Sequence, residues 1–194
     1  MTLMSKVRDS GMPGEEYWES LFSVDDIIHK MRINSEIFNL VEIGFGYGTF
    51  TVPMAKMIKG KLFAFDIEGE LSENFSKRLN SNNIKNTEYK IQDVLTQGTG
   101  LGDSDVDYFA LFNIMHHEHP EQFLKEAFRV LKPGALCGII HWRSDITTPR
   151  GPSLDIRPKP EFIEFLLVNN GFEIEENKIL LEPYHFGIIG RKKL

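Results

Sequence analysis

The feature that most constrains the fold of this chain is an alternation that begins near residue 37. Short apolar runs alternate there with longer segments that carry apolar residues at helical spacing. Near-continuous apolar strands separated by helices are typical of a parallel sheet that is covered on both faces. We therefore expect a doubly wound, Rossmann-like α/β fold. The expected strands are 38–43, 61–67, 87–92, 107–114 and 135–142, and the expected helices are 49–59, 69–81, 120–131 and 159–170.

The C-terminal end adds a second constraint on the sheet. Residues 172–181 and 184–191 are predicted as two strands joined by a turn at Glu182 and Pro183. A connection this short cannot link parallel strands, because a parallel crossover needs roughly a dozen residues. The sequence therefore predicts a seven-stranded sheet that is mostly parallel, with the last strand antiparallel.

The length of 194 residues suits one α/β domain. We expect this domain to span residues 36–194, preceded by a helical extension over residues 1–35. Within the extension, residues 1–14 hold two glycines and a proline and are predicted as a loose leader, and residues 15–31 as one or two short amphipathic helices. Tyr17, Trp18 and Phe22 either form an aromatic lid over the functional site or simply pack on the sheet.

Composition restricts the location and the partners. The net charge of −6 argues against a broad nucleic-acid-binding surface, which is usually basic. No apolar stretch approaches the roughly 20 residues of a membrane span, and the charged N-terminus does not resemble a signal peptide. The single cysteine, Cys137, rules out an internal disulfide. We expect a cytoplasmic protein without a nucleic-acid or membrane partner, and the sequence leaves its oligomeric state open.

A glycine-rich loop lies between the first strand and the first helix of the predicted sheet. Gly44, Gly46 and Gly48 let the backbone turn sharply and let a ligand approach closely. Asp66 ends the next strand, where an acid can accept hydrogen bonds from ribose hydroxyls. A nicotinamide-dependent dehydrogenase is disfavoured, because its fingerprint needs Gly or Ala where this chain has Thr49, and because no second domain is visible.

The segment from Glu42 to Gly48 resembles the first motif of the class I S-adenosylmethionine-dependent methyltransferases, and residues 128–135 resemble the helix and turn before their fifth strand. The resemblance covers about residues 36–191 and implies S-adenosylmethionine as the cofactor. Three of the implied roles have structural alternatives: Glu42 as a brace of the loop, Asp66 as a helix cap and Asp93 as a loop residue. The residues that the resemblance implies at the cofactor are Glu42, Gly44, Phe45, Gly46, Gly48, Asp66, Ile67, Asp93, Val94 and Asn113.

Methyl transfer from a sulfonium is an in-line displacement, so the protein chiefly positions the acceptor and excludes water. A general base is needed only if the acceptor must lose a proton. The candidates that follow strands four and five are His116, His117, His141 and Arg143. We expect no metal site, since three histidines on one tight turn rarely offer tetrahedral geometry.

The loop over residues 143–157 carries three arginines and two aspartates. The arginines either recognise an acceptor with a carboxylate or another anion, Arg143 first among them, or pair with the aspartates to brace the loop. The sequence after strand four, Asn113-Ile114-Met115-His116, departs from the Asn/Asp-Pro-Pro-Tyr run of enzymes that methylate nucleic-acid bases. A small-molecule acceptor is therefore expected. The alternative is a non-catalytic S-adenosylmethionine-binding module that serves a partner protein.

Overall fold

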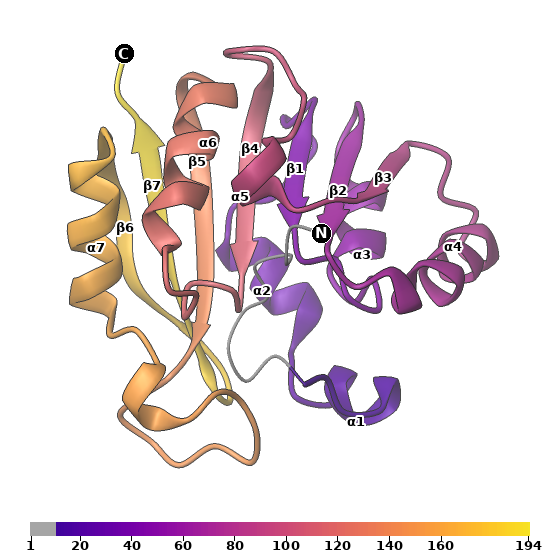
Figure 1. The fold of residues 1–194 in the computed structure, drawn as a ribbon, viewed down its shortest axis with the longest axis horizontal. Helices are drawn as coiled ribbons and strands as arrows, with labels where there is room; N and C mark the ends of the chain where they lie inside the picture. Colours follow the sequence, from indigo (N-terminus) through magenta and orange to yellow (C-terminus); the bar gives the residue numbers. More distant parts are fainter. Residues whose placement is uncertain (1–10) are drawn as a thin grey trace.

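The computed structural model of the chain describes residues 11–194, and the part of the expected leader over residues 1–10 lies outside this range. Seven strands form one sheet in the order β3-β2-β1-β4-β5-β7-β6 (Figure 1). The strands are β1 (Leu40–Ile43), β2 (Leu62–Asp66), β3 (Thr87–Ile91), β4 (Val106–Phe112), β5 (Leu131–Trp142), β6 (Phe172–Leu181) and β7 (His185–Lys192).

The first five strands pair in parallel, whereas β7 runs antiparallel to both of its neighbours, β5 and β6. The predicted seven-stranded sheet with an antiparallel last strand is therefore confirmed. The helices are α1 (Glu15–Glu19), α2 (Val24–Lys30), α3 (Thr51–Met57), α4 (Ser72–Ser81), α5 (Val94–Gln97), α6 (Pro120–Val130) and α7 (Pro160–Asn169), with short 3₁₀ turns at Gly69–Leu71 and Leu154–Ile156.

Two hydrophobic cores lie on opposite faces of the sheet. Buried side chains of α2, α3 and α4 belong to one core, and those of α5, α6 and α7 belong to the other. Residues 108–112 of β4 are all apolar because the strand is buried on both faces: Tyr108 and Ala110 face the first core, whereas Phe109 and Leu111 face the second. Because successive side chains point to opposite faces, a strand buried on both sides has no polar alternation.

The structure corrects some predicted boundaries. Strand β5 starts at Leu131 rather than at residue 135, because Leu131 pairs with Val106 across an irregularity that precedes the pair Tyr108–Leu136. The first helix after the glycine loop begins at Thr51 rather than at residue 49. The connection between β3 and β4, for which the sequence predicts no helix, begins with the short helix α5.

The sheet order reverses direction between β1 and β4, which lie side by side although β2 and β3 separate them in the chain. In an open α/β sheet, ligands bind beyond the carboxyl ends of the strands at such a switch point. The register places Ile43 level with Phe65 of β2 and with Leu111 of β4. The loops that follow these three strands therefore meet at one edge. Over residues 11–194, every helix is too short or too polar to cross a membrane.

Candidate functional site

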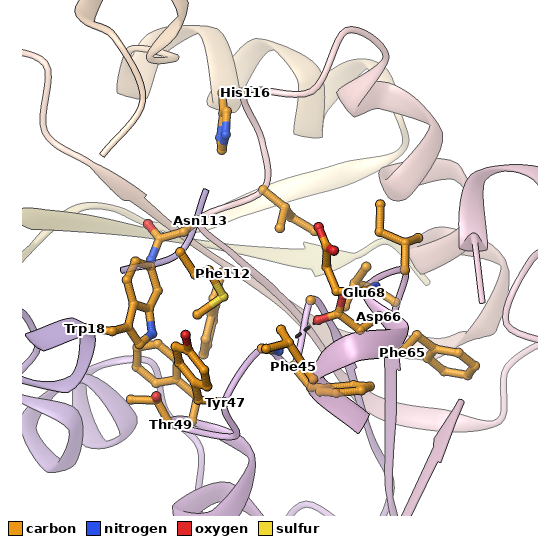
Figure 2. Close-up of a pocket in the computed structure, with 18 of the residues that line it drawn as sticks. Trp18, Phe45, Tyr47, Thr49, Phe65, Asp66, Glu68, Phe112, Asn113 and His116 are labelled. Atoms are coloured by element: carbon orange, nitrogen blue, oxygen red, sulfur yellow. Dashed lines mark hydrogen bonds between the residues drawn. The ribbon is translucent and has the colours of Figure 1, made fainter. Parts of the chain in front are cut away.

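A cavity of about 670 Å³ opens at this edge of the sheet (Figure 2). The loops after β1, β2, β3 and β4 supply most of its wall, and the N-terminal segment and the loop after β5 complete it. The expected site residues on its wall are Gly44, Phe45, Gly46, Asp66, Ile67, Asp93, Val94, Asn113 and His116.

Asp66 ties the end of β2 to the glycine loop. Its Oδ2 accepts a hydrogen bond from the backbone N–H of Gly46 at 2.8 Å, and its Oδ1 accepts one from the backbone N–H of Glu68 at 2.9 Å. Burial raises the pKa of Asp66, and the hydrogen bonds from these backbone N–H groups oppose the rise. Each carboxylate oxygen has a further lone pair, so Asp66 can still accept hydrogen bonds from a ligand in the cavity.

Glu42, at the end of β1, and Gly48, in the glycine loop, do not line the cavity. The carboxylate of Glu42 is buried and accepts a hydrogen bond from the Thr51 hydroxyl at 2.5 Å. Burial raises the pKa of Glu42 to about 8, with Thr51 opposing the rise. Gly48 has a φ of +84°, and a Cβ there would come within 3.0 Å of the Phe75 ring. Glu42 fits the bracing alternative, and Gly48 packs against Phe75 rather than on the cavity wall.

The end of β3 contributes Asp93 and Val94 to the wall. Asp93 is buried and caps α5, because its side chain accepts a hydrogen bond from the backbone N–H of Leu95 at 3.0 Å. This hydrogen bond fixes the carboxylate at the edge of the cavity beside Val94. Asp93 therefore both caps α5 and lies in the site.

The opposite end of the cavity is aromatic. Trp18, Phe50, Phe112 and Trp142 line it, with Phe50 and Phe112 at a ring-centroid distance of 5.1 Å and Trp18 and Trp142 at 6.4 Å. The sequence singled out only Trp18 of these four. The others face the cavity because of strand register and helix packing, which leave no local signal in the sequence.

The N-terminal segment closes over this end. The Tyr47 hydroxyl donates a hydrogen bond to the carbonyl oxygen of Pro13 at 2.9 Å, which attaches the segment to the glycine loop. Helix α1 is also held by ion pairs from Arg78 to Glu15 and Glu19. Of the three aromatic residues expected as a lid, Trp18 reaches the cavity, Phe22 is buried beside it and Tyr17 is half exposed.

Asn113 follows β4 directly and lines the cavity with an unusual backbone. Its φ is +60°, in the left-handed region that asparagine tolerates better than most residues. Both polar atoms of its side chain are buried, and among residues 11–194 neither has a hydrogen-bond partner. In Figure 2 the amide lies on the side of the cavity with Trp18 and Phe112, away from Asp66.

The structure separates the candidate histidines. His116 lines the cavity, and its Nδ1 lies 3.1 Å from Nε2 of the fully buried His141. His141 lies behind His116 rather than on the wall, and burial lowers its pKa well below the ordinary value. His117 borders a second cavity, and its Nδ1 accepts a hydrogen bond from the backbone N–H of His119 at 2.9 Å.

The structure does not bring Arg143 to the cavity. Its guanidinium makes two hydrogen bonds to the Asp145 carboxylate, at 3.0 and 2.9 Å. Arg157 donates to the backbone carbonyl oxygens of Pro152, Arg143 and Arg150, which fixes the loop from inside. Pairing with an aspartate therefore accounts for Arg143, whereas Arg157 braces the loop through backbone carbonyl oxygens. Arg150 lines the cavity, and its guanidinium donates to the carbonyl oxygen of Gly11.

In the described part of the chain, no group of three or more His, Cys, Asp or Glu residues is arranged to hold an ion.

Comparisons with known proteins agree with this geometry. The profile of the family described as "Methyltransferase domain" matches residues 40–134, which include the glycine loop, Asp66, Asp93 and Asn113. No curated protein matches the sequence.

Solved structures share the fold. A SAM-dependent methyltransferase from Aquifex aeolicus has a TM-score of 0.79 at 23% identity, with 92% of this chain and 93% of that chain covered. A structure of SAM-dependent methyltransferases from Methanosarcina mazei has a TM-score of 0.65 at 19% identity, covering 87% and 97% of the two chains. The [4+2]-cyclase SpnF has a TM-score of 0.73 at 13% identity, covering 100% and 88%.

The match spans the loop and the acid that the resemblance singled out, and the sheet order places both on one cavity wall. Residues 40–134 are therefore similar to the methyltransferase-domain family, and the chain has the fold of SAM-dependent methyltransferases.

Proposed function

We propose that this chain is an S-adenosylmethionine-dependent methyltransferase that acts on a small-molecule acceptor held in the cavity at the end of β1, β2 and β4. The observation that carries the proposal is the two-ended cavity itself. One end has the glycine loop and carboxylates, and the other has four aromatic side chains under the N-terminal segment. Its volume of about 670 Å³ lies in the range of sites for small molecules and cofactors. A covered site of this kind suits a free metabolite better than a segment of a macromolecule.

The residues at the first end fit S-adenosylmethionine. Asp66 offers further carboxylate lone pairs to ribose hydroxyls, and Ile67 offers an apolar surface beside it. Asp93 and Val94 border the same end and suit the adenine. With the ribose and the adenine placed in this way, the glycine loop contacts the methionine end of the cofactor.

The glycine loop can hold the methionine end closely. Gly44 and Gly46 have positive φ angles and line the cavity together with Phe45. Beneath them, the buried pair of Glu42 and Thr51 holds the loop in shape without reaching the ligand. We therefore propose direct contact for the residues on the wall and a supporting role for Glu42 and Gly48.

The bound cofactor supplies a methyl group on a sulfonium, already activated for displacement. The chain then has to orient the acceptor and keep water out. We propose that the N-terminal extension is a lid for this purpose, because Trp18 reaches the cavity from α1 and closes its aromatic end. The lid is attached to the glycine loop through Tyr47 and to α4 through Arg78.

His116 is the proposed base for acceptors that lose a proton. The carbonyl oxygen of Trp142 can only accept, and it lies 3.4 Å from Nδ1 of His141, so that nitrogen carries the proton. Nε2 of His141 then accepts from Nδ1–H of His116. This arrangement leaves the lone pair of His116 on its Nε2 and gives His141 a positioning role.

The experiment measures S-adenosylhomocysteine formation with a panel of small hydroxy, amino and thiol compounds. At least one acceptor should turn over. The His116→Asn variant should bind S-adenosylhomocysteine normally, lose about 10²-fold in kcat/KM for that acceptor and lose its acid limb in the pH profile. His119→Asn is the matched control, because His119 is exposed on the same loop. If no acceptor in the panel reacts while a partner protein changes cofactor affinity, the chain is the non-catalytic module instead.

A further inference from the structure

The amide of Asn113 is the strongest unexplained feature of the cavity. Its Oδ1 and Nδ2 are both buried, and among the described residues neither is hydrogen-bonded. A buried polar group without a partner costs free energy, so such groups are normally satisfied by protein, water or ligand. An amide lining a ligand cavity with both atoms unpaired therefore indicates that a ligand is its partner.

The position of Asn113 assigns that ligand to the acceptor rather than to the cofactor. Asp66 and the glycine loop lie at one end, whereas the Asn113 amide lies at the end with Trp18 and Phe112 (Figure 2). The backbone N–H of Asn113 donates to the carbonyl oxygen of Ile140 at 2.8 Å, which fixes this residue between β4 and β5. The backbone that carries the amide is therefore held in place before a ligand arrives.

The walls around the amide select a flat, apolar molecule. Phe50 and Phe112 meet edge to face, and so do Trp18 and Trp142, so the end of the cavity presents ring surfaces. Aromatic side chains pack well on planar rings. A second unpaired polar atom, the buried hydroxyl of Thr49, also belongs to the cavity wall.

The two atoms of the amide define the edge of the ligand. Oδ1 accepts a hydrogen bond and Nδ2 donates one, and the two point the same way from one planar group. The complementary edge carries an N–H next to a carbonyl oxygen, as in a cyclic amide. We propose that the acceptor is a neutral, planar heteroaromatic ring with adjacent donor and acceptor atoms, which Asn113 orients by two hydrogen bonds. This inference rests on the proposed function and specifies its substrate class.

The backbone conformation of Asn113 offers a second explanation for an asparagine at this position, and the variants must distinguish it from ligand binding. Asparagine is one of the few residues that accept a φ of +60°, so it could be required for the turn alone. Asn113→Gly keeps this backbone conformation and deletes the amide. Asn113→Asp keeps the shape and replaces the donor by a second acceptor.

The experiment titrates 2-quinolone, which has the proposed edge, and N-methyl-2-quinolone, which lacks the donor, into protein saturated with S-adenosylhomocysteine. The smaller lactam 2-pyridone tests the size of the site. The wild type should bind a lactam with a free N–H at least tenfold more tightly than the N-methyl compound. Asn113→Gly should lose this preference, whereas Asn113→Asp should weaken the binding of both quinolones, because it removes the donor to their carbonyl oxygen. The affinity of both variants for S-adenosylhomocysteine should stay within about twofold of the wild type.

Equal affinity of the wild type for 2-quinolone and its N-methyl form overturns the proposal, and so does a preference that survives in Asn113→Gly. Absence of binding of all three probes at millimolar concentration also overturns it. These outcomes leave the proposed function intact as long as S-adenosylhomocysteine binds. Failure of the wild type to bind S-adenosylhomocysteine removes the proposed function and the inference together.

Discussion

Replacing Glu42 by glutamine should stabilise the cofactor-free protein, and increasingly so at higher pH. The carboxyl group is 1% exposed, and its one hydrogen bond comes from the Thr51 hydroxyl at 2.5 Å. Burial raises its pKa from 4.5 to about 8, so the folded protein keeps a proton there that the unfolded chain releases near pH 4.5. Stability is therefore lost as the pH rises from about 4.5 to about 8.

The magnitude follows from the interval between the two pKa values. Each pH unit between them costs about 1.4 kcal/mol, which gives a loss of about 4 kcal/mol at pH 7.5 and about 1 kcal/mol at pH 5. Glutamine has the shape of the protonated acid and does not titrate. Glu42→Gln should therefore raise the free energy of unfolding by about 4 kcal/mol at pH 7.5 and by about 1 kcal/mol or less at pH 5.

Urea denaturation followed by circular dichroism at both pH values measures this difference. Glu36→Gln is the matched control, because Glu36 is exposed and pairs only loosely with Lys59, at 3.6 Å. The control should show no pH-dependent gain. An equal difference in the free energy of unfolding between the wild type and Glu42→Gln at both pH values would refute the reasoning. It would show that Glu42 has the same pKa in the folded and unfolded chains.

Three further predictions test the packing of the site and its surroundings. His185 is buried and its pKa is lowered to about 3, so the stability of His185→Phe relative to the wild type should increase by about 2 kcal/mol between pH 6.5 and pH 5 in urea denaturation. Gly48→Ala should destabilise the fold by about 1–3 kcal/mol in thermal melts, because a Cβ at φ +84° meets Phe75 at 3.0 Å, and an unchanged melting temperature would contradict this packing. Arg143→Ala should leave the affinity for S-adenosylhomocysteine within about twofold, because Arg143 pairs with Asp145 outside the cavity. A tenfold loss in that titration would place Arg143 in the site after all.

The sequence contained enough information for the sheet and for one half of the site. Strands such as β4 are buried on both faces, so they appear as continuous apolar runs that a sequence pattern detects. Gly44 and Asp66 were also predictable as a pair. The loop lies directly after β1, and parallel pairing of β1 with β2 places the two strand ends together.

The other half of the cavity depends on packing that no local pattern encodes. Phe112 faces the cavity because of its register in β4, and Trp18 reaches it only through the placement of α1. The arginines of the loop after β5 show the same limit. Arg143 follows the strand directly, which favours it on sequence alone. The loop is instead fixed by the bonds of Arg157 to three backbone carbonyl oxygens, and Arg150 is the arginine on the cavity wall.

Calorimetric titration of the wild type and of Asp66→Asn with S-adenosylhomocysteine tests the central claim most directly, because Asp66 joins the glycine loop to the end of β2. We expect micromolar binding by the wild type and a loss of about 1–3 kcal/mol in the folded variant, as charged hydrogen bonds are removed. The absence of binding to S-adenosylmethionine and S-adenosylhomocysteine, together with tight binding of a nicotinamide dinucleotide, would contradict the account.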